Sequence, residues 1–359
     1  MIDQIGSIVK NTFDSFFNAG YSRLFIIDDN ANWVLRCEAM ELQKIAADLG
    51  INARLRHTFR GIFRQNIFFT SHFDLPRIAG FAAAGNRIGI SYFHGKPTKD
   101  EPEFEINLGA LSKYHGMISK VQVTHKEMKD IVLSTGIDES KVHLIPIGIN
   151  LSYFTPATSE SRRKARAKYS IPDSSTVIGY FQKDGNGWGE GLTPKLIKGP
   201  DIFLEAVKKL KSKHDNLFVL LSGPSRGYVK RGLAEAGIPF KHVFVADYSH
   251  IGQLYHAIDL YMVTSRQEGG PKAVLECMAS DVPLITTRVG QAMELVKHKE
   301  NGWMVDVEDI DGLAGWASYV IENYSSLGGV LKNARATAQE NSYSRLVPLW
   351  GQFFDGMVL

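Results

Sequence analysis

The sequence predicts an α/β protein built from two consecutive βαβ domains. Short apolar runs alternate with segments of helical periodicity along the chain, which is typical of parallel sheets covered by helices. The 359 residues are enough for two domains that each have a core. A stretch rich in Ser, Thr and Pro at 155–161 reads as a linker. We therefore expect an N-terminal domain at 1–153, a second domain at 154–340 and a C-terminal helical segment at 341–359.

The first half contains apolar runs that are short enough to be buried strands. Each run is rich in Val, Ile, Leu or Phe and gives way to polar residues. Pro146 ends the last run, because proline cannot donate to a sheet ladder. Strands are expected at 24–28, 67–70, 88–91, 117–123 and 142–146, and a helix is expected at 33–49.

The second half repeats this alternation. Its clearest helix is expected at 201–214, where apolar residues recur every three or four positions and the lysines fall on the opposite side. A short basic helix is expected at 162–168, and strands are expected at 176–181, 216–221, 242–245, 260–263 and 284–287.

Composition narrows the functional classes. The net charge of +3 and the pI of about 8.6 are too small to argue for nucleic acid as a partner. No stretch reaches the eighteen or so apolar residues of a membrane span. The first twenty residues lack the apolar core and cleavage site of a signal peptide, and the two cysteines lack metal-ligand spacing. We therefore expect a cytoplasmic protein.

The strongest chemical signal is the run Glu268-Gly269-Gly270-Pro271-Lys272-Ala273-Val274-Leu275-Glu276, which follows the strand expected at 260–263. Proline suits the first turn of a helix, and two glycines before it let the backbone approach a ligand. The N–H groups of Lys272 and Ala273 would then form an anion site at the helix N-terminus. A diphosphate fits this position.

The two glutamates of this run suggest binding of hydroxyl groups. Eight residues at helical rise separate Glu268 from Glu276 by roughly 12 Å, which is comparable to the distance between the two sugar rings of a nucleotide sugar. A carboxylate can accept hydrogen bonds from two adjacent hydroxyls. The alternative is that both are solvated glutamates favoured by the helix dipole.

The run resembles the motif of the GT-B glycosyltransferases of family 4, the group 1 glycosyl transferases. Their C-terminal domain carries two glutamates separated by seven residues, as Glu268 and Glu276 are. The likeness extends over 142–323 and includes Lys198-Gly199-Pro200-Asp201, whereas the N-terminal half matches only loosely. It implies two Rossmann-like domains that face a central cleft, with the C-terminal helix packed back on the N-terminal domain.

The resemblance also implies roles for the matching residues. Glu268 would contact hydroxyls of the transferred sugar, and Glu276 would contact the ribose. The backbone from Gly269 through Pro271 to Ala273 would hold sugar and phosphate. Lys198 would pair with the diphosphate and stabilise the charge that develops on it.

The reaction implied is a retaining transfer of a hexose-type sugar from a nucleotide-diphosphate sugar. The acceptor attacks the front face and the leaving phosphate accepts the proton, so neither a metal nor another cofactor is needed. The partners implied are the donor and an acceptor that is a sugar, a lipid-linked molecule or a protein, in polysaccharide or glycoconjugate biosynthesis. The sequence names neither the base, the sugar, the acceptor nor the oligomeric state.

Three further positions in the second half are candidates for donor contacts. Tyr180 stands near the place where the family commonly has an arginine, and Lys183 can supply the missing charge. The glycine-rich loop 184–191 can wrap a phosphate with Trp188 over a sugar face, or it is simply flexible. Arg266 can reach a phosphate or base, and a surface salt bridge is the alternative.

In the first half, His94 at the end of a strand resembles the family's cleft-facing histidine. It is expected to bind the donor sugar or to position the acceptor. His72 and His115 are rivals, and a lone histidine is more often structural. The segment 28–33 replaces the family's glycine loop, so it is read as part of an acceptor pocket or as a helix cap.

Two segments raise the question of a peripheral contact with the inner face of the membrane. One is the basic helix 162–168, and the other is the apolar series Ile5, Ile8, Val9, Phe13, Phe16 and Phe17. The alternatives are a solvated face for the first and core packing for the second.

Two other functions remain open at this stage. One is an epimerase or a phosphorylase on the same fold, and the other is a nucleotide-sugar-binding module without catalysis. A nicotinamide dehydrogenase is disfavoured, because no G-x-G-x-x-G run opens a helix after a strand.

Overall fold

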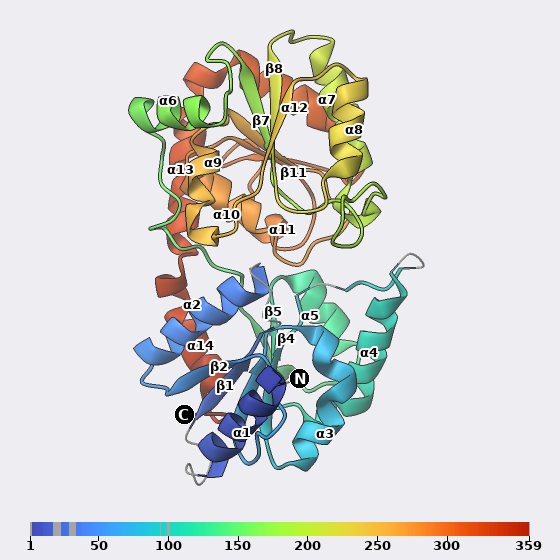
Figure 1. The fold of residues 1–359 in the computed structure, drawn as a ribbon, viewed down its shortest axis with the longest axis vertical. Coiled ribbons are helices and arrows are strands. Elements are labelled where there is room, and N and C mark those ends of the chain that lie inside the picture. Colours follow the sequence, from blue (N-terminus) through green and yellow to red (C-terminus); the bar gives the residue numbers. More distant parts are fainter. Residues whose placement is uncertain (1, 17–22, 29–33, 94, 99–100, 359) are drawn as a thin grey trace. The chain divides into compact units, whose positions relative to one another are not determined.

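The computed structural model describes residues 2–16, 23–28, 34–93, 95–98 and 101–358, without the side chains of 2–4, 16 and 34. The chain divides into two compact units (Figure 1). The first comprises Met1–Ile147 together with Tyr343–Leu359, and the second comprises Gly148–Ser342. The sequence places this division at 153/154. Each unit is described by itself.

The first unit has a six-stranded parallel sheet in the order β2-β1-β3-β4-β5-β6. Alternate residues of the strand at 24–27 enter different cores: Phe25 and Ile27 lie in one apolar cluster, and Leu24 and Ile26 lie in the other. Both faces of the sheet are therefore buried. The strands are β1 (Leu24–Ile27), β2 (Ala53–Arg56), β3 (Asn66–Phe69), β4 (Arg87–Ser91), β5 (Lys120–Val123) and β6 (Val142–Leu144).

Helices cover both faces of this sheet. The last one packs on the same face as α2, where Trp350 and Phe353 meet the ring of Phe68 edge-on. The hydroxyl of Tyr343 donates to Glu38 at 2.5 Å, which ties the two helices together. The helices are α1 (Ile2–Phe16), α2 (Val34–Asp48), α3 (Ile78–Ala83), α4 (Pro102–Tyr114), α5 (Lys126–Leu133) and α14 (Tyr343–Phe354).

The second unit has a six-stranded parallel sheet in the order β12-β11-β10-β7-β8-β9. The chain runs from β7 to β8 and β9 on one side, while β10 lies on the other side of β7. This reversal is a topological switch point, where ligands bind beyond the carboxyl ends of parallel strands. The strands are β7 (Thr176–Tyr180), β8 (Leu217–Ser222), β9 (Phe240–Val243), β10 (Leu260–Val263), β11 (Leu284–Thr287) and β12 (Trp303–Val305).

Two apolar clusters bury the two faces of this sheet as well. Val177 belongs to one cluster, whereas Ile178 and Tyr180 of the same strand belong to the other. The helices are α6 (Ser159–Lys168), α7 (Pro200–Lys211), α8 (Gly227–Glu235), α9 (Gly252–Tyr255), α10 (Lys272–Ala279), α11 (Ala292–Leu295), α12 (Ile310–Glu322) and α13 (Gly328–Glu340).

The fold class predicted from the sequence, two Rossmann-like α/β domains, is confirmed. The strands β10 and β11 begin and end at the predicted residues. The sequence analysis missed β2 and β12, which both lie at a sheet edge. The strand β2 reads Ala-Arg-Leu-Arg and is only partly buried, so it lacks the apolar run of a central strand. The strand β12 is apolar and buried but only three residues long.

Candidate functional site

The expected chemical motif follows the central strand β10 at the switch point of the second unit. Thr264 and Ser265 leave the strand fully buried, and the loop then continues to Pro271. Pro271 is the cap residue of α10, one position earlier than the first-turn position expected from the sequence. Because proline has no side-chain acceptor, the cap adds no hydrogen bond, and the first turn of α10 keeps its anion-attracting character.

Lys198 and Glu268 form an ion pair at this position. The Nζ atom of Lys198 lies 2.6 Å from Oε2 of Glu268, and their side chains are only 19% and 10% exposed. The hydroxyl of Ser265 donates to the other carboxylate oxygen at 2.8 Å. The structure thus brings two of the three expected catalytic residues together and fixes the carboxylate from both sides.

The backbone around Lys198 is positioned by several hydrogen bonds. Its carbonyl oxygen accepts from Nε2 of Gln182 at 2.7 Å and from the hydroxyl of Tyr180 at 3.2 Å. The next residue, Gly199, has a left-handed backbone (φ 63°) and lies against Thr264, whose hydroxyl donates to its carbonyl at 2.8 Å. The cation therefore stands on a rigid connection between the ends of β7 and β10.

A side chain at position 199 should disturb this arrangement. A Cβ atom there would lie 1.9 Å from the carbonyl oxygen of Thr264, in a backbone conformation that disfavours side chains. We expect Gly199→Ala to lower the free energy of unfolding by more than about 1 kcal/mol and to weaken donor binding, both measured against wild type. Gly315→Ala, at an exposed helical glycine with open space around it, is the control and should be neutral or slightly stabilising. An unchanged donor affinity in Gly199→Ala would contradict this role.

Glu276, the second glutamate of the motif, is 5% exposed and held by two tyrosines. The hydroxyl of Tyr248 donates to one oxygen at 2.5 Å, and that of Tyr255 donates to the other at 2.6 Å. Burial, and secondly the charge of Glu276, raise the pKa of Tyr255, so this hydroxyl stays protonated and donating. A carboxylate has about four lone-pair sites, so each oxygen can still accept from a hydroxyl of a ligand. The sequence analysis missed both tyrosines, since they lie outside the motif.

The loop between the two glutamates packs closely against the segment of Gly290 and Gln291. The carbonyl oxygen of Gly269 accepts from the backbone of Gln291 at 2.8 Å. A Cβ atom on Gly290 would lie within 2.5 Å of the carbonyl oxygens of Glu268 and Gly269, so only glycine allows this approach. At the start of α10, the Nζ atom of Lys272 lies 4.9 Å from the ring centre of Tyr248. The segment from Gly269 to Ala273 thus has a defined shape in the described structure.

Arg266 has strong protein partners. Its guanidinium contacts both carboxylate oxygens of Asp201, at 2.7 and 2.9 Å, and Nε contacts Glu308 at 2.6 Å. Nη1 also donates to the carbonyl of Leu196 at 2.7 Å. A phosphate or base would have to compete with these contacts. The geometry therefore favours the salt-bridge alternative, in which Arg266 ties the loop after β10 to the segment that carries Lys198.

Lys183 lies just beyond the end of β7. Its Nζ atom stands 3.8 Å from the ring centre of Trp188, which is 64% exposed. Burial, and secondly the charge of Lys195, lower the pKa of Lys183 below its usual value. A second cation therefore lies on the β7 side of the switch point, and its contact with a phosphate stays a prediction.

The glycine-rich loop 184–191 is fastened to the domain. The hydroxyl of Ser225 lies 3.0 Å from the carbonyl oxygens of Gly187 and Gly189, and the carbonyl of Glu190 accepts from the backbone of Gly227 at 2.7 Å. Several hydrogen bonds thus hold this loop, and its contact with a phosphate stays a prediction.

A buried ion pair lies beneath the same loop. Nη2 of Arg226 is 3.0 Å from Asp184, and both side chains are fully buried. Burial raises the pKa of Asp184 to about 6 against the opposing charge of Arg226. The guanidinium also donates to the carbonyl of Ser222 and lies 4.9 Å from the ring centre of Tyr180. The loop is thus connected to the residues that support Lys198.

In the first unit, His94 lies outside the described residues, and its expected role stays a prediction. His72 is buried and stacks against the rings of Tyr92 and Phe73, which fits the structural alternative. The sequence analysis did not single out His57, which follows the edge strand β2 and pairs with the buried Asp28 at the end of β1.

The described residues contain neither a cluster of metal ligands nor a membrane-spanning helix. No three His, Cys, Asp or Glu side chains in these ranges gather as ligands for a metal ion. None of the helices within them is both long and apolar enough to cross a membrane.

Comparison with known proteins finds relatives of most of the second unit. Residues 192–344 match the family model of glycosyl transferases group 1. The lipopolysaccharide core biosynthesis mannosyltransferase LpsB of Rhizobium meliloti is 27% identical over 153 residues, which cover 40% of this chain and 44% of that protein. A D-inositol 3-phosphate glycosyltransferase of Jonesia denitrificans is 26% identical over 259 residues, covering 66% and 58%. The matched part thus spans about half the length of these curated relatives.

Solved structures resemble the whole chain. Anabaena HepE in complex with UDP superposes with a TM-score of 0.73 at 17% identity, over 93% of this chain and 100% of that one. The sucrose-phosphate synthase of Thermosynechococcus elongatus gives 0.72 at 15% identity, over 94% and 99%. At these identities the likeness shows the fold, and the fold is that of GT-B proteins.

Proposed function

We propose that this chain, a GT-B protein whose residues 192–344 carry the group 1 glycosyl transferase domain, moves a hexose-type sugar from a nucleotide-diphosphate sugar to an acceptor. The observation that carries the proposal is the ion pair of Lys198 with Glu268, a glutamate in the loop that leads into α10. A cation, a carboxylate and a helix N-terminus together match the charges and hydroxyls of a sugar diphosphate.

Each group has a task in this proposal. Lys198 binds the diphosphate together with the backbone from Gly270 to Ala273, and Glu268 accepts hydrogen bonds from hydroxyls of the sugar. Without a donor, the lysine and the glutamate neutralise each other at 2.6 Å. When a diphosphate binds, the lysine shares its protons with it, and the carboxylate is left to accept from the sugar. Ser265 keeps the carboxylate in place during this exchange.

The chemical step breaks the bond between the anomeric carbon and the diphosphate oxygen, whose electron pair leaves with the diphosphate. The acceptor hydroxyl bonds to the same face of the anomeric carbon and gives its proton to the leaving phosphate oxygen. The configuration is retained, and neither a metal nor another cofactor takes part. Lys198 stabilises the negative charge that grows on the phosphate, which is the largest catalytic contribution we assign.

Glu276 receives the ribose of the donor in this proposal. Its oxygens already accept from Tyr248 and Tyr255, which fix the carboxylate plane and leave lone pairs for the two ribose hydroxyls. UDP and UDP-glucose are bound in crystals of the structural neighbour HepE, which supports a nucleotide sugar as the donor class. Lys183 is the second cation that we assign to the diphosphate. Arg266 is not assigned to the donor, because it pairs with Asp201 and Glu308.

The acceptor remains a sugar, a lipid-linked molecule or a protein hydroxyl, and polysaccharide or glycoconjugate biosynthesis is the setting we propose. We place the reaction in the cytoplasm, at the inner face of the membrane, with no nucleic acid as a partner. His94 stays the proposed contact of the first unit.

The test is a thermal-shift screen against UDP-, GDP- and ADP-sugars, followed by mass detection of products with a panel of acceptors. We expect one nucleotide sugar to raise the melting temperature and free nucleoside diphosphate to appear together with a glycosylated acceptor. Interconversion of the sugar without an acceptor would indicate an epimerase, and release driven by inorganic phosphate would indicate a phosphorylase. Binding without turnover across the panel would support the binding-module alternative and contradict transfer.

A further inference from the structure

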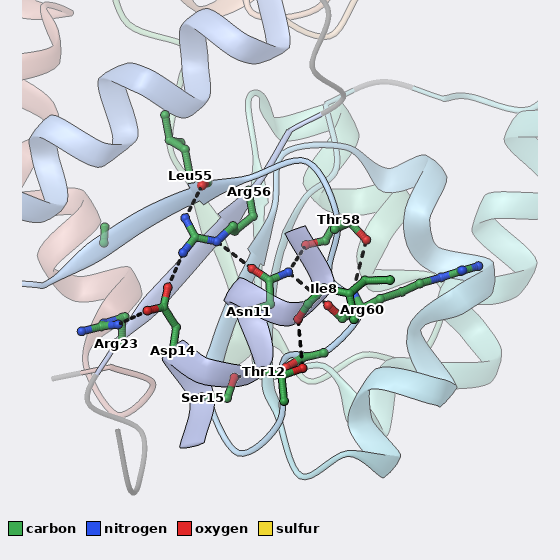
Figure 2. Close-up of polar contacts among 12 residues, drawn as sticks. Ile8, Asn11, Thr12, Asp14, Ser15, Arg23, Leu55, Arg56, Thr58 and Arg60 are labelled. Carbon is green, nitrogen blue, oxygen red and sulfur yellow. Dashed lines mark hydrogen bonds and ion pairs between the residues drawn. The ribbon is translucent and has the colours of Figure 1, made fainter. Parts of the chain in front are cut away.

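The first helix of the protein is attached by its polar face. Figure 2 shows the amide of Asn11, which is fully buried, reaching into the segment after β2. Its nitrogen donates to the carbonyl oxygens of Thr58 and Arg60 at 2.9 and 3.1 Å, and its oxygen accepts from Nε of Arg56 at 2.6 Å. The helix is thus held by a saturated set of hydrogen bonds.

Further polar contacts extend this attachment along α1. Asp14 forms ion pairs with Arg56 and, at 3.4 Å, with Arg23 (Figure 2). A Cβ atom on Gly61 would lie 2.8 Å from the carbonyl oxygen of Ile8, so the helix backbone approaches the domain very closely there. The orientation of α1 about its own axis is therefore fixed.

Three apolar residues of α1 consequently face solvent. Ile5, Val9 and Phe13 are 56%, 62% and 61% exposed, and their spacing of four places them in one stripe. A helix on a soluble domain normally turns such a stripe toward the core. The core-packing alternative from the sequence is wrong for these three residues, and an exposed apolar stripe marks an interaction surface.

The surroundings of the stripe are cationic. The segment 53–64, which holds α1, contains four arginines and no acidic residue. Lys10 on the helix and Arg60 and Arg64 on this segment are exposed. The acidic residues of α1 are Asp3 and Asp14, and the latter is already paired with two arginines.

The basic helix α6, the other segment considered for membrane contact, has less free charge for such a contact. Arg162 and Arg166 both turn inward to the carboxylate of Asp259, and Lys164 pairs with Glu160. Three of its five cations are thus neutralised within the protein, and it has no exposed apolar stripe of its own. The first unit is the better place for a docking surface.

We propose that α1 lies flat on an anionic lipid bilayer, with Ile5, Val9 and Phe13 inserted at the headgroup boundary and the neighbouring cations against lipid phosphates. A second copy of the chain fits less well. Three side chains cover far less than the roughly 800 Å² per partner of a stable dimer. Pairing two copies of this surface would also bring its cations together. The inference concerns an attachment surface and does not depend on the transfer reaction.

The test is co-sedimentation of the full chain with vesicles. We expect binding to vesicles of phosphatidylcholine with phosphatidylglycerol, and little binding to phosphatidylcholine alone. The triple variant Ile5→Ser, Val9→Ser, Phe13→Ser should bind at least about tenfold more weakly, and its melting curve should show that it stays folded, because all three side chains are more than half exposed. Lys10→Gln with Arg64→Gln should weaken binding and reduce its salt dependence.

Ile106→Ser is the matched control, because Ile106 is 63% exposed on another helix of the same unit. It should bind like wild type. Absence of binding to anionic vesicles at low salt would overturn the proposal. So would equal binding of the triple variant, or a concentration-dependent dimer that the triple variant abolishes, which would assign the stripe to a second copy.

Discussion

Lys198→Ala and Glu268→Ala are each expected to lower the rate of sugar transfer by about 10²–10³-fold while the protein stays folded. The lysine is the cation that contacts Glu268, at 2.6 Å, and Glu268 lies in the loop that leads into α10. Loss of the lysine removes the charge that stabilises the departing diphosphate. Loss of the glutamate removes the acceptor for the sugar hydroxyls.

The control for these variants is Lys208→Ala on α7. Lys208 is exposed and pairs with Glu205 on the same helix, and such surface pairs contribute about 0–1 kcal/mol. Its transfer rate should equal that of wild type. Melting curves for all three variants separate loss of activity from loss of fold. Undiminished transfer by both Lys198→Ala and Glu268→Ala would refute the assigned roles.

Arg226→Met is expected to lower the free energy of unfolding by about 3–5 kcal/mol. The substitution leaves the fully buried carboxyl of Asp184 without its cation, and it removes the bond to the carbonyl of Ser222. Since the pair lies beneath the loop 184–191 and beside Tyr180, the variant should also bind nucleotide sugars more weakly.

The effect should depend on pH in a defined direction. Burial raises the pKa of Asp184 to about 6, so the folded protein holds this proton more tightly than the unfolded chain does. The contribution of Asp184 to the free energy of unfolding is favourable at low pH and is lost as pH rises through its folded-state pKa. Without Arg226 the folded-state pKa rises further, so the deficit of the variant should be larger near pH 8 than near pH 5.

Urea denaturation at both pH values measures this. Arg231→Met is the matched control, because Arg231 is exposed on the adjoining helix α8 and pairs with Glu235 one turn further along the same helix. It should change the free energy of unfolding by less than about 0.5 kcal/mol. The account would be contradicted if Arg226→Met lowered the free energy of unfolding by as little as the control does. It would also be contradicted if the loss for Arg226→Met became smaller as pH rises.

The sequence predicts the centre of each domain well, because central parallel strands must be apolar on both faces. β10 and β11 are examples whose ends agree residue by residue. The edge strand β2 escapes this logic, because it is only partly buried and carries two arginines, whereas the buried strand β12 is only three residues long. The helix α1 shows a further limit: periodicity detects its apolar stripe, but the direction of that stripe is set by the contacts of Asn11 and Asp14.

For the candidate site, the sequence indicates the motif and the structure supplies its neighbours. Lys198 and Glu268 are seventy residues apart and meet because they follow adjacent parts of the sheet. The tyrosines on Glu276 carry no sequence signal of their own, since any buried hydroxyl at the right place would serve. Arg266 looks like a ligand contact in the sequence, and only the positions of Asp201 and Glu308 reveal its partners.

The central claim is that Lys198 binds the diphosphate of the donor and Glu268 binds its sugar. Calorimetric titration tests this claim most directly. The titrants are the nucleotide sugar selected by the screen of UDP-, GDP- and ADP-sugars and its nucleoside diphosphate. We predict that Lys198→Ala weakens binding of both by about tenfold or more, whereas Glu268→Ala weakens binding of the nucleotide sugar and leaves the nucleoside diphosphate unaffected. Wild-type affinity of both variants for both titrants would contradict the claim.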